Sequence, residues 1–170
     1  MNSSLEAKAI YKTSLISTFH DFLEEIGIVL RKGEVLPGSF LPGVNIMAGE
    51  IVYDESTLLF PGDILHEAGH IAVSDAAGRA ELFGNVAEVN SGKAGEEMAV
   101  LLWTWAAIQK IGIPPEIVFH EVGYKDESEW LIDNFKEGNY VGLHLLVWMG
   151  MTKQSGTPGG FPLMTNWLRV

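Results

Sequence analysis

Two histidines four residues apart, His66 and His70, lie in the segment "GDILHEAGHIAV", with Glu67 directly after the first of them. Residues four apart lie on one face of a helix, so both imidazoles could bind the same metal ion. Glu67 would point about 100° round the helix and flank the ion, where a carboxylate can take a proton from an activated water. The segment therefore predicts a metal site that performs hydrolysis.

The two residues between Glu67 and His70 are small. Ala68 and Gly69 would let a second helix, or a substrate, approach this turn closely. Glycine inside a helix lowers its stability by about 1 kcal/mol relative to alanine, which a purely structural helix has little reason to carry. The alternative interpretation is a buried helix whose histidines hold no metal, and the metal site is the favoured one.

A catalytic zinc ion takes three protein ligands, so a third ligand must come from elsewhere in the chain. The chain has no cysteine, which leaves His, Asp and Glu. Glu96 and Glu97 open a second helical segment, 26 and 27 residues after the second histidine. Asp75, soon after that histidine, is a rival. His120 and His144 are weaker candidates because each stands alone in an apolar setting, where histidine is more often a packed core residue.

Apolar residues at helical spacing predict the elements that carry these side chains. The expected helices run from Ser4 to about Ile26, over "ILHEAGHIAV", from about Ala94 to Gln109 and near Ser128 to Lys136, with a shorter helix or turn at "PPEIVFH". Asp63 is expected to cap the second helix, although it could also orient His66 from three residues away. The histidine pair and the glutamate pair therefore fall on different helices.

The remaining segments predict a small sheet. Residues 28–60 carry short apolar runs broken by glycine and proline, which favours two to four strands. "VNIMAGEIVYD" is typical of a hairpin with its turn at Ala48-Gly49-Glu50, and another strand is expected near Glu81 to Val89. Periodicity does not settle whether "YVGLHLLVWMG" forms a helix or a strand. The apolar tail "FPLMTNWLRV" should pack back onto the protein. The expected fold is α+β, with helices packed on a small, mostly antiparallel sheet.

The composition limits the class of protein. With 170 residues and 47 % apolar content, the chain can form one domain over residues 1–170 with a substantial core. Its formal charge of −11 disfavours nucleic-acid binding, which needs a basic surface. The N-terminus lacks the pattern of an export signal, and the longest apolar run, at 99–108, is too short to cross a bilayer. We therefore expect a cytoplasmic protein without membrane contact.

"LHEAGH" resembles the active-site helix of the zincin metallopeptidases, and the acidic helix that follows resembles their glutamate-liganded branch, the gluzincins. Within that branch, the compact ImmA/IrrE-like peptidases are similar in size and spacing over residues 58–105. The segments "LHEAGH" and "GEEMA" are also similar to those of bacterial proteins of unknown activity. The resemblance implies a zincin-like fold, a Zn²⁺ cofactor and a peptide or protein substrate.

The resemblance also implies roles for individual residues. The third ligand of such peptidases is typically a glutamate followed three residues later by a small residue. Glu96, followed by Ala99, fits this pattern better than Glu97, so Glu96 is the implied ligand and Glu97 the alternate. A further Tyr or His often stabilises the oxyanion in these enzymes, and Tyr124 and His120 are weak candidates for this role. A surface or packing role is the favoured interpretation of both.

These observations predict a zinc-dependent metallopeptidase. His66, His70 and Glu96 would bind Zn²⁺, while Glu67 would activate the water that attacks a peptide carbonyl. The alternative is a non-catalytic module of the same fold that uses the metal for stability or for binding a partner. The two differ in coordination, because a catalytic zinc keeps an open position and a structural zinc is closed by protein ligands.

Overall fold

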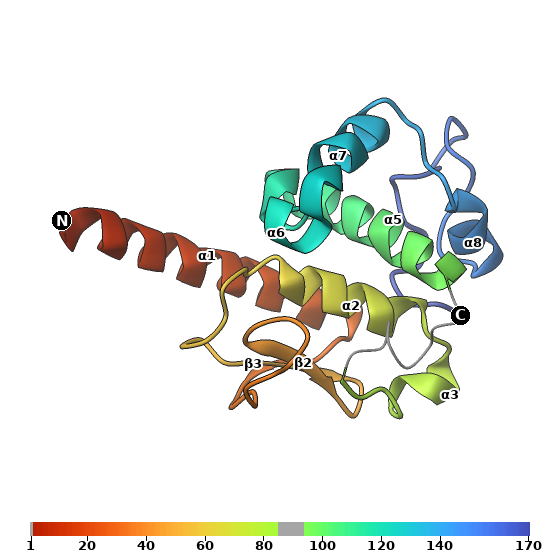
Figure 1. Cartoon of the computed structure of the whole chain (residues 1–170). Helices are drawn as coiled ribbons and strands as arrows, with labels where there is room; N and C mark the ends of the chain where they lie inside the picture. Colours follow the sequence, from red (N-terminus) through yellow and green to blue (C-terminus); the bar gives the residue numbers. More distant parts are fainter. Residues whose placement is uncertain (1, 85–93) are drawn as a thin grey trace.

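The computed structural model describes residues 2–84 and 94–170 (Figure 1). Its strands are β1 (Leu30–Lys32), β2 (Val44–Met47) and β3 (Glu50–Tyr53). Its α-helices are α1 (Asn2–Ile26), α2 (Asp63–Val73), α3 (Ala76–Arg79), α5 (Ala94–Ile111), α6 (Glu121–Tyr124), α7 (Ser128–Lys136) and α8 (Leu143–Trp148). Two 3₁₀ turns, η1 (Pro115–Ile117) and η2 (Lys125–Glu127), complete the described elements. The α+β class expected from the sequence is confirmed.

The three strands form one mixed sheet in the order β1-β3-β2. β2 and β3 form the predicted hairpin, whose turn residues Ala48 and Gly49 have φ values of 52° and 74°. Two consecutive positive φ angles are typical of a type I′ turn, which matches the twist of a hairpin. β1 pairs with β3 in parallel, so the expectation of a mostly antiparallel sheet is corrected. The hairpin pattern is local, whereas the side on which β1 joins depends on how the loop after it folds.

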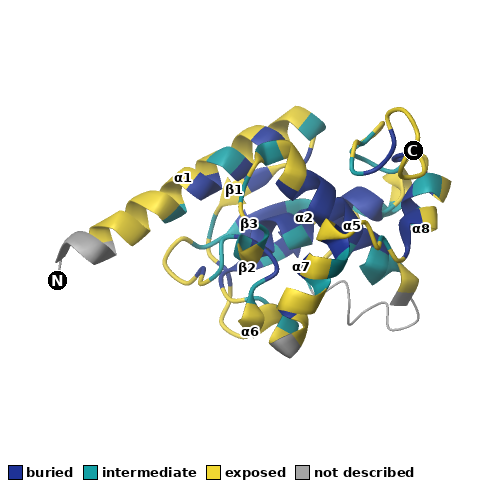
Figure 2. Ribbon diagram, turned by 90° about the horizontal axis from the view of Figure 1, so that it is seen from above, coloured by how far each residue is buried: buried dark blue, intermediate teal, exposed yellow. Residues whose placement is uncertain are grey.

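The helices follow the predicted segments closely. α1 ends where Gly27 adopts a φ of 85°, and the Ile28 amide donates to the Leu23 carbonyl at 2.9 Å. This geometry is the usual glycine end of a helix. The N-terminal part of α1 extends away from the other elements (Figure 1), and its described side chains are largely exposed (Figure 2). The segment that periodicity left unassigned contains α8.

α2 lies between the sheet and α5 (Figure 1). Every residue of α2 except His66 is buried (Figure 2). A Cβ atom added to Gly69 would lie 2.8 Å from Val100 Cγ1 and 3.3 Å from Thr104 Oγ1 of α5, which is closer than ordinary packing allows. The absence of a side chain at Gly69 therefore lets α5 lie against α2, as the small residues of this turn predicted.

The C-terminal tail packs back onto the helices, as expected. The Trp103 indole donates to the Trp167 carbonyl at 2.9 Å, and the Arg169 amide donates to the Ala72 carbonyl at 2.9 Å. The strand expected near Glu81 to Val89 lies mostly outside the described residues, and its described part forms one isolated bridge between Phe83 and Met47. Within the described ranges, no helix is both long and apolar enough to cross a membrane.

Candidate metal centre

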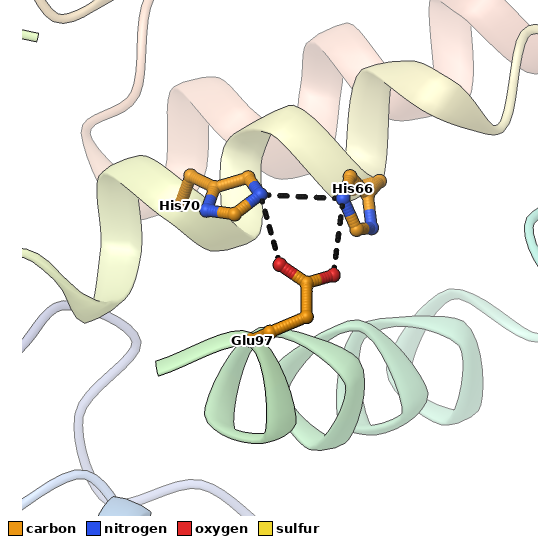
Figure 3. A group of neighbouring side chains, drawn as sticks. All are labelled: His66, His70 and Glu97. Atoms are coloured by element: carbon orange, nitrogen blue, oxygen red, sulfur yellow. Dashed lines mark hydrogen bonds and ion pairs between the residues drawn. The ribbon is translucent and has the colours of Figure 1, made fainter. Parts of the chain in front are cut away.

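The two histidines of α2 and one glutamate of α5 point toward one another (Figure 3). The Nε2 atoms of His66 and His70 are 3.2 Å apart. Glu97 places one carboxylate oxygen 3.5 Å from His66 Nε2 and the other 3.5 Å from His70 Nε2. Among the described residues, this is the group of His, Asp and Glu side chains that could hold a metal ion.

The spacing of these three side chains fits a tetrahedral ion. Ligand atoms about 2.0–2.1 Å from a tetrahedral zinc lie about 3.3–3.4 Å from each other. The two imidazole Nε2 atoms are 3.2 Å apart, and each lies 3.5 Å from one of the two carboxylate oxygens, which is close to that value. Nitrogen and oxygen donors suit zinc and several other divalent transition metals, so the donor set supports a metal site without naming the metal.

The carboxylate of this cluster belongs to Glu97, the alternate, and not to Glu96, which the resemblance favoured. Consecutive residues of a helix point about 100° apart, so α5 can turn only one of them toward α2. The choice depends on the rotation of α5 about its own axis, and the close contact at Gly69 fixes that rotation. The preference for Glu96 is therefore corrected by one residue.

The other candidate ligands lie outside the cluster. Asp75 caps the short helix α3, where its side chain accepts a hydrogen bond from the Gly78 amide at 2.7 Å. His144 is exposed on α8. Neither belongs to the group that could hold an ion. The rival positions considered for the third ligand are thus replaced by Glu97.

Burial keeps the two histidines of the cluster neutral. It lowers the pKa of His66 to about 3, with smaller effects of the neighbouring histidines, and the pKa of His70 to about 4. Desolvation disfavours the charged imidazolium in both cases. A neutral imidazole offers a lone pair on one ring nitrogen, which is the form that binds a metal. Both side chains are therefore in the protonation state that a metal site requires.

Glu67 lies beside the cluster and is itself buried. Burial, with smaller contributions from the nearby carboxylates of Asp63 and Glu97, raises the pKa of Glu67 to about 8. At neutral pH the metal-free carboxyl group therefore holds its proton. A cation in the cluster would favour the carboxylate, because an opposite charge within a few ångströms stabilises the ionised form. Glu67 is thus a proton-binding group next to the predicted ion.

Tyr124 reaches the cluster from α6. Its hydroxyl oxygen lies 3.1 Å from His66 Nδ1, the ring nitrogen that points away from the cluster. Burial raises the pKa of Tyr124 above its usual range, so the hydroxyl keeps its proton. The side chain also lines the pocket that contains the cluster. Tyr124 can therefore contact both a ligand histidine and a molecule in the pocket.

His120 and Asp63 form a largely buried pair, which agrees with a packed role for His120 and differs from the expectation for Asp63. His120 Nε2 lies 2.9 Å from Asp63 Oδ1, and His120 does not line the pocket of the cluster. Gly62, not Asp63, is the N-cap residue of α2, and no side chain caps that end. The expected capping role of Asp63 is therefore wrong, because its carboxylate turns toward His120. Nothing in the sequence signals this contact, since the partners are 57 positions apart.

The cluster opens into a pocket of about 660 Å³. Glu67, His66, His70 and Glu97 lie on its wall, together with apolar side chains from three regions: Phe40, Leu41, Leu101 and Leu131. Ligand sites typically combine apolar walls with a few converging polar groups. The pocket is thus large enough for part of a peptide chain beside the cluster. The sequence did not predict these apolar residues, which periodicity cannot distinguish from core.

Comparisons of the chain with known protein families, with curated proteins and with solved structures find no match.

Proposed function

We propose that the protein is a zinc-dependent hydrolase that cleaves peptide bonds. The observation that carries the proposal is the convergence of two neutral imidazoles and one carboxylate at tetrahedral spacing, next to the buried Glu67 and inside a pocket. This is the ligand set of a catalytic zinc that keeps one open position. The proposal joins this geometry to the chemistry that the "LHEAGH" segment predicts.

His66, His70 and Glu97 would hold the ion in the proposed site. A bound Zn²⁺ would supply a Lewis acid and would lower the pKa of water at its open position to about 7. The chain's own contribution is to keep both imidazoles neutral by burial and to aim their Nε2 atoms at one point. Glu97 completes the set from the facing helix.

Glu67 and Tyr124 would handle protons and charge during hydrolysis. Glu67 accepts a proton as water adds to the carbonyl and passes it to the departing amine, the usual task of a carboxylate in this position. The Tyr124 hydroxyl, protonated at neutral pH, donates a hydrogen bond to the oxygen that becomes negative. The apolar walls around Leu101 and Leu131 limit access of bulk water and contact the substrate.

The substitution Glu67→Gln tests the proposed activity. We expect Glu67→Gln to bind zinc as the wild type does but to lose at least about a hundredfold in the cleavage rate of a mixed peptide library, because the amide cannot accept the proton. Zinc is measured by mass spectrometry of protein purified without a histidine tag, and cleavage by liquid chromatography. Glu129→Gln removes an exposed carboxylate of α7 and serves as the matched control.

Two results would contradict the proposal. Wild-type protein that takes up no zinc and gains no stability from it would exclude the metal site. Zinc with four protein ligands, counted by X-ray absorption, together with no cleavage of any peptide, would exclude the hydrolase and favour a structural metal module.

A further inference from the structure

His120 connects the start of α2 to the turn that carries Tyr124. Its side chain is 11 % exposed and stacks on Phe60, with ring centroids 3.9 Å apart and an interplanar angle of 12°. The Gly123 amide donates to its Nδ1 at 3.0 Å, so Nδ1 carries the lone pair. Nε2 therefore carries the proton and donates it to Asp63 Oδ1 at 2.9 Å. Both ring nitrogens have defined partners.

Two glycines permit this arrangement. A Cβ atom on Gly62 would lie 2.0 Å from the Ile117 carbonyl oxygen, so the segment before His120 can lie against the start of α2 only because Gly62 has no side chain. A Cβ atom on Gly123 would lie 2.8 Å from His120 Cε1, so the ring lies directly over the α6 backbone. The position of His120 is thus set by close backbone packing on both sides.

The turn that His120 caps ends at Tyr124, four residues later. The Tyr124 hydroxyl lies 3.1 Å from His66 Nδ1. If His66 binds an ion through Nε2, Nδ1 must carry the imidazole proton, and the tyrosine oxygen must accept it. The hydroxyl proton of Tyr124 then remains available for a donor role in the pocket. A ligand histidine is usually oriented by such a partner on its second nitrogen.

We infer that His120 and Asp63 are positioning residues for the metal centre. They hold α6 so that the Tyr124 hydroxyl accepts the His66 Nδ1 proton and thereby fixes the tautomer in which His66 Nε2 faces the ion. This inference rests on the metal site of the proposed function and adds a contact path from Asp63 through His120 and Tyr124 to His66. It assigns no direct contact with substrate to His120.

A double-substitution cycle tests this path through the zinc affinity, measured by competition with a chromogenic chelator. His120→Asn and Tyr124→Phe should each weaken zinc binding by about tenfold or more, the usual effect of losing an outer-shell partner. The double variant should bind as Tyr124→Phe alone does, because His120 acts only through Tyr124. The visible spectrum of bound Co²⁺ should change in the same way in both single variants.

Two further variants separate the contacts of His120. His120→Gln can still donate to Asp63, so it should recover part of the affinity that His120→Asn loses. Gly123→Ala displaces the ring without removing a hydrogen-bonding group and should weaken zinc binding in the same direction as His120→Asn. Thr152→Ala removes a hydroxyl that donates to Leu163 in the C-terminal segment, so it should lower stability and leave the zinc affinity unchanged.

Two outcomes would overturn the inference: zinc affinity of His120→Asn within about twofold of wild type, or effects of His120→Asn and Tyr124→Phe that multiply in the double variant. The ring ¹⁵N shifts of His66 in the metal-free protein provide a readout without metal, because they report which nitrogen carries the proton. A protein that binds no zinc would refute the proposed function. If the protein binds no zinc, ring ¹⁵N shifts of His66 that change alike in His120→Asn and Tyr124→Phe would still support the contact path from Asp63 to His66. Ring shifts that are unchanged in His120→Asn would refute that path.

Discussion

Among the residues that the structure describes, two partly buried groups of histidine and carboxylate side chains differ in how their protons are placed. In the His120–Asp63 pair, one ring nitrogen accepts from a backbone amide and the other donates to the carboxylate. In the cluster of His66, His70 and Glu97, two Nε2 atoms and two carboxylate oxygens face one another within 3.2–3.5 Å. In the first group both ring nitrogens of His120 have partners, although Asp63 Oδ2 is buried with no hydrogen-bond partner among the described residues. The second group instead directs two imidazole nitrogens and both carboxylate oxygens of Glu97 toward one another.

The comparison shows that residue type does not by itself identify a metal site. Both groups are at least partly buried, and burial raises the pKa of the carboxyl groups of Asp63 and Glu97 alike. At Asp63 the hydrogen bond from His120 opposes that effect by stabilising the carboxylate. At Glu97 the raised pKa comes from burial, and a bound cation would stabilise the charged carboxylate. The convergence of possible ligand atoms from three side chains, which the His120–Asp63 pair does not offer, is therefore the feature that indicates a cation.

Removal of one ligand should separate the two groups most clearly. His70→Ala should weaken zinc binding by about a hundredfold or more, because it deletes a metal ligand. His120→Ala should weaken zinc binding less, because loss of an outer-shell contact typically lowers metal affinity by about 10–100-fold. Chelator competition measures the affinities of His70→Ala and His120→Ala side by side. Equal losses in both variants would mean that the comparison between ligand and positioning histidines does not hold.

Neutralising one glutamate at a time sharpens the assignment of the third ligand. Zinc at a hundred times its dissociation constant should raise the free energy of unfolding by about 2.7 kcal/mol in the wild type. We expect Glu96→Gln to keep most of this stabilisation and Glu97→Gln to lose it at the same zinc concentration. Urea unfolding with and without zinc measures both, and the reverse order would return the ligand role to Glu96.

The stability of the metal-free protein should depend on pH in two windows. The pKa values of His66 and His70 are lowered from 6.5 to about 3 and 4, so stability falls as pH drops below 6.5 and the unfolded chain takes up protons. The pKa of Glu67 is raised from 4.5 to about 8, so stability also falls as pH rises toward 8.

Glu67→Gln isolates the alkaline window, because the amide stays neutral. Thermal unfolding of the metal-free protein at several pH values between 6 and about 9 should show a smaller loss of stability in Glu67→Gln than in the wild type. Below pH 6.5 the acid loss should be steeper in Glu67→Gln, because the proton on Glu67 offsets part of the histidine effect in the wild type down to about pH 4.5. An unchanged alkaline slope in Glu67→Gln would show that Glu67 is ionised in the metal-free fold.

A methyl group at the contact between α2 and α5 should have the smallest effect. Gly69→Ala gains about 1 kcal/mol of helix propensity but forces its Cβ to within 2.8 Å of Val100 Cγ1, and overpacking typically costs about 1–3 kcal/mol. We expect a net loss of about 1 kcal/mol and a weaker zinc affinity. Val100→Ala should restore both, and a Gly69→Ala protein as stable as wild type would show that the contact is not tight.

The sequence was sufficient for the features that depend on near neighbours. Spacing of three and four residues placed His66, Glu67 and His70 correctly on one helix, because helical periodicity is set by the backbone. The hairpin of β2 and β3 followed from the turn at Ala48 and Gly49. The small residues of the "HEAGH" turn indicated that a second helix packs there, and α5 does so.

Only the tertiary structure decided which distant groups meet. Glu97 rather than Glu96 faces the histidines because the contact of α5 with Gly69 sets the rotation of α5, which no local pattern encodes. Asp63 pairs with His120 because Gly62 lets the chain near Ile117 approach α2. Local backbone preferences determine which face of a helix carries a side chain, whereas the partner across that face depends on packing between segments far apart in the chain.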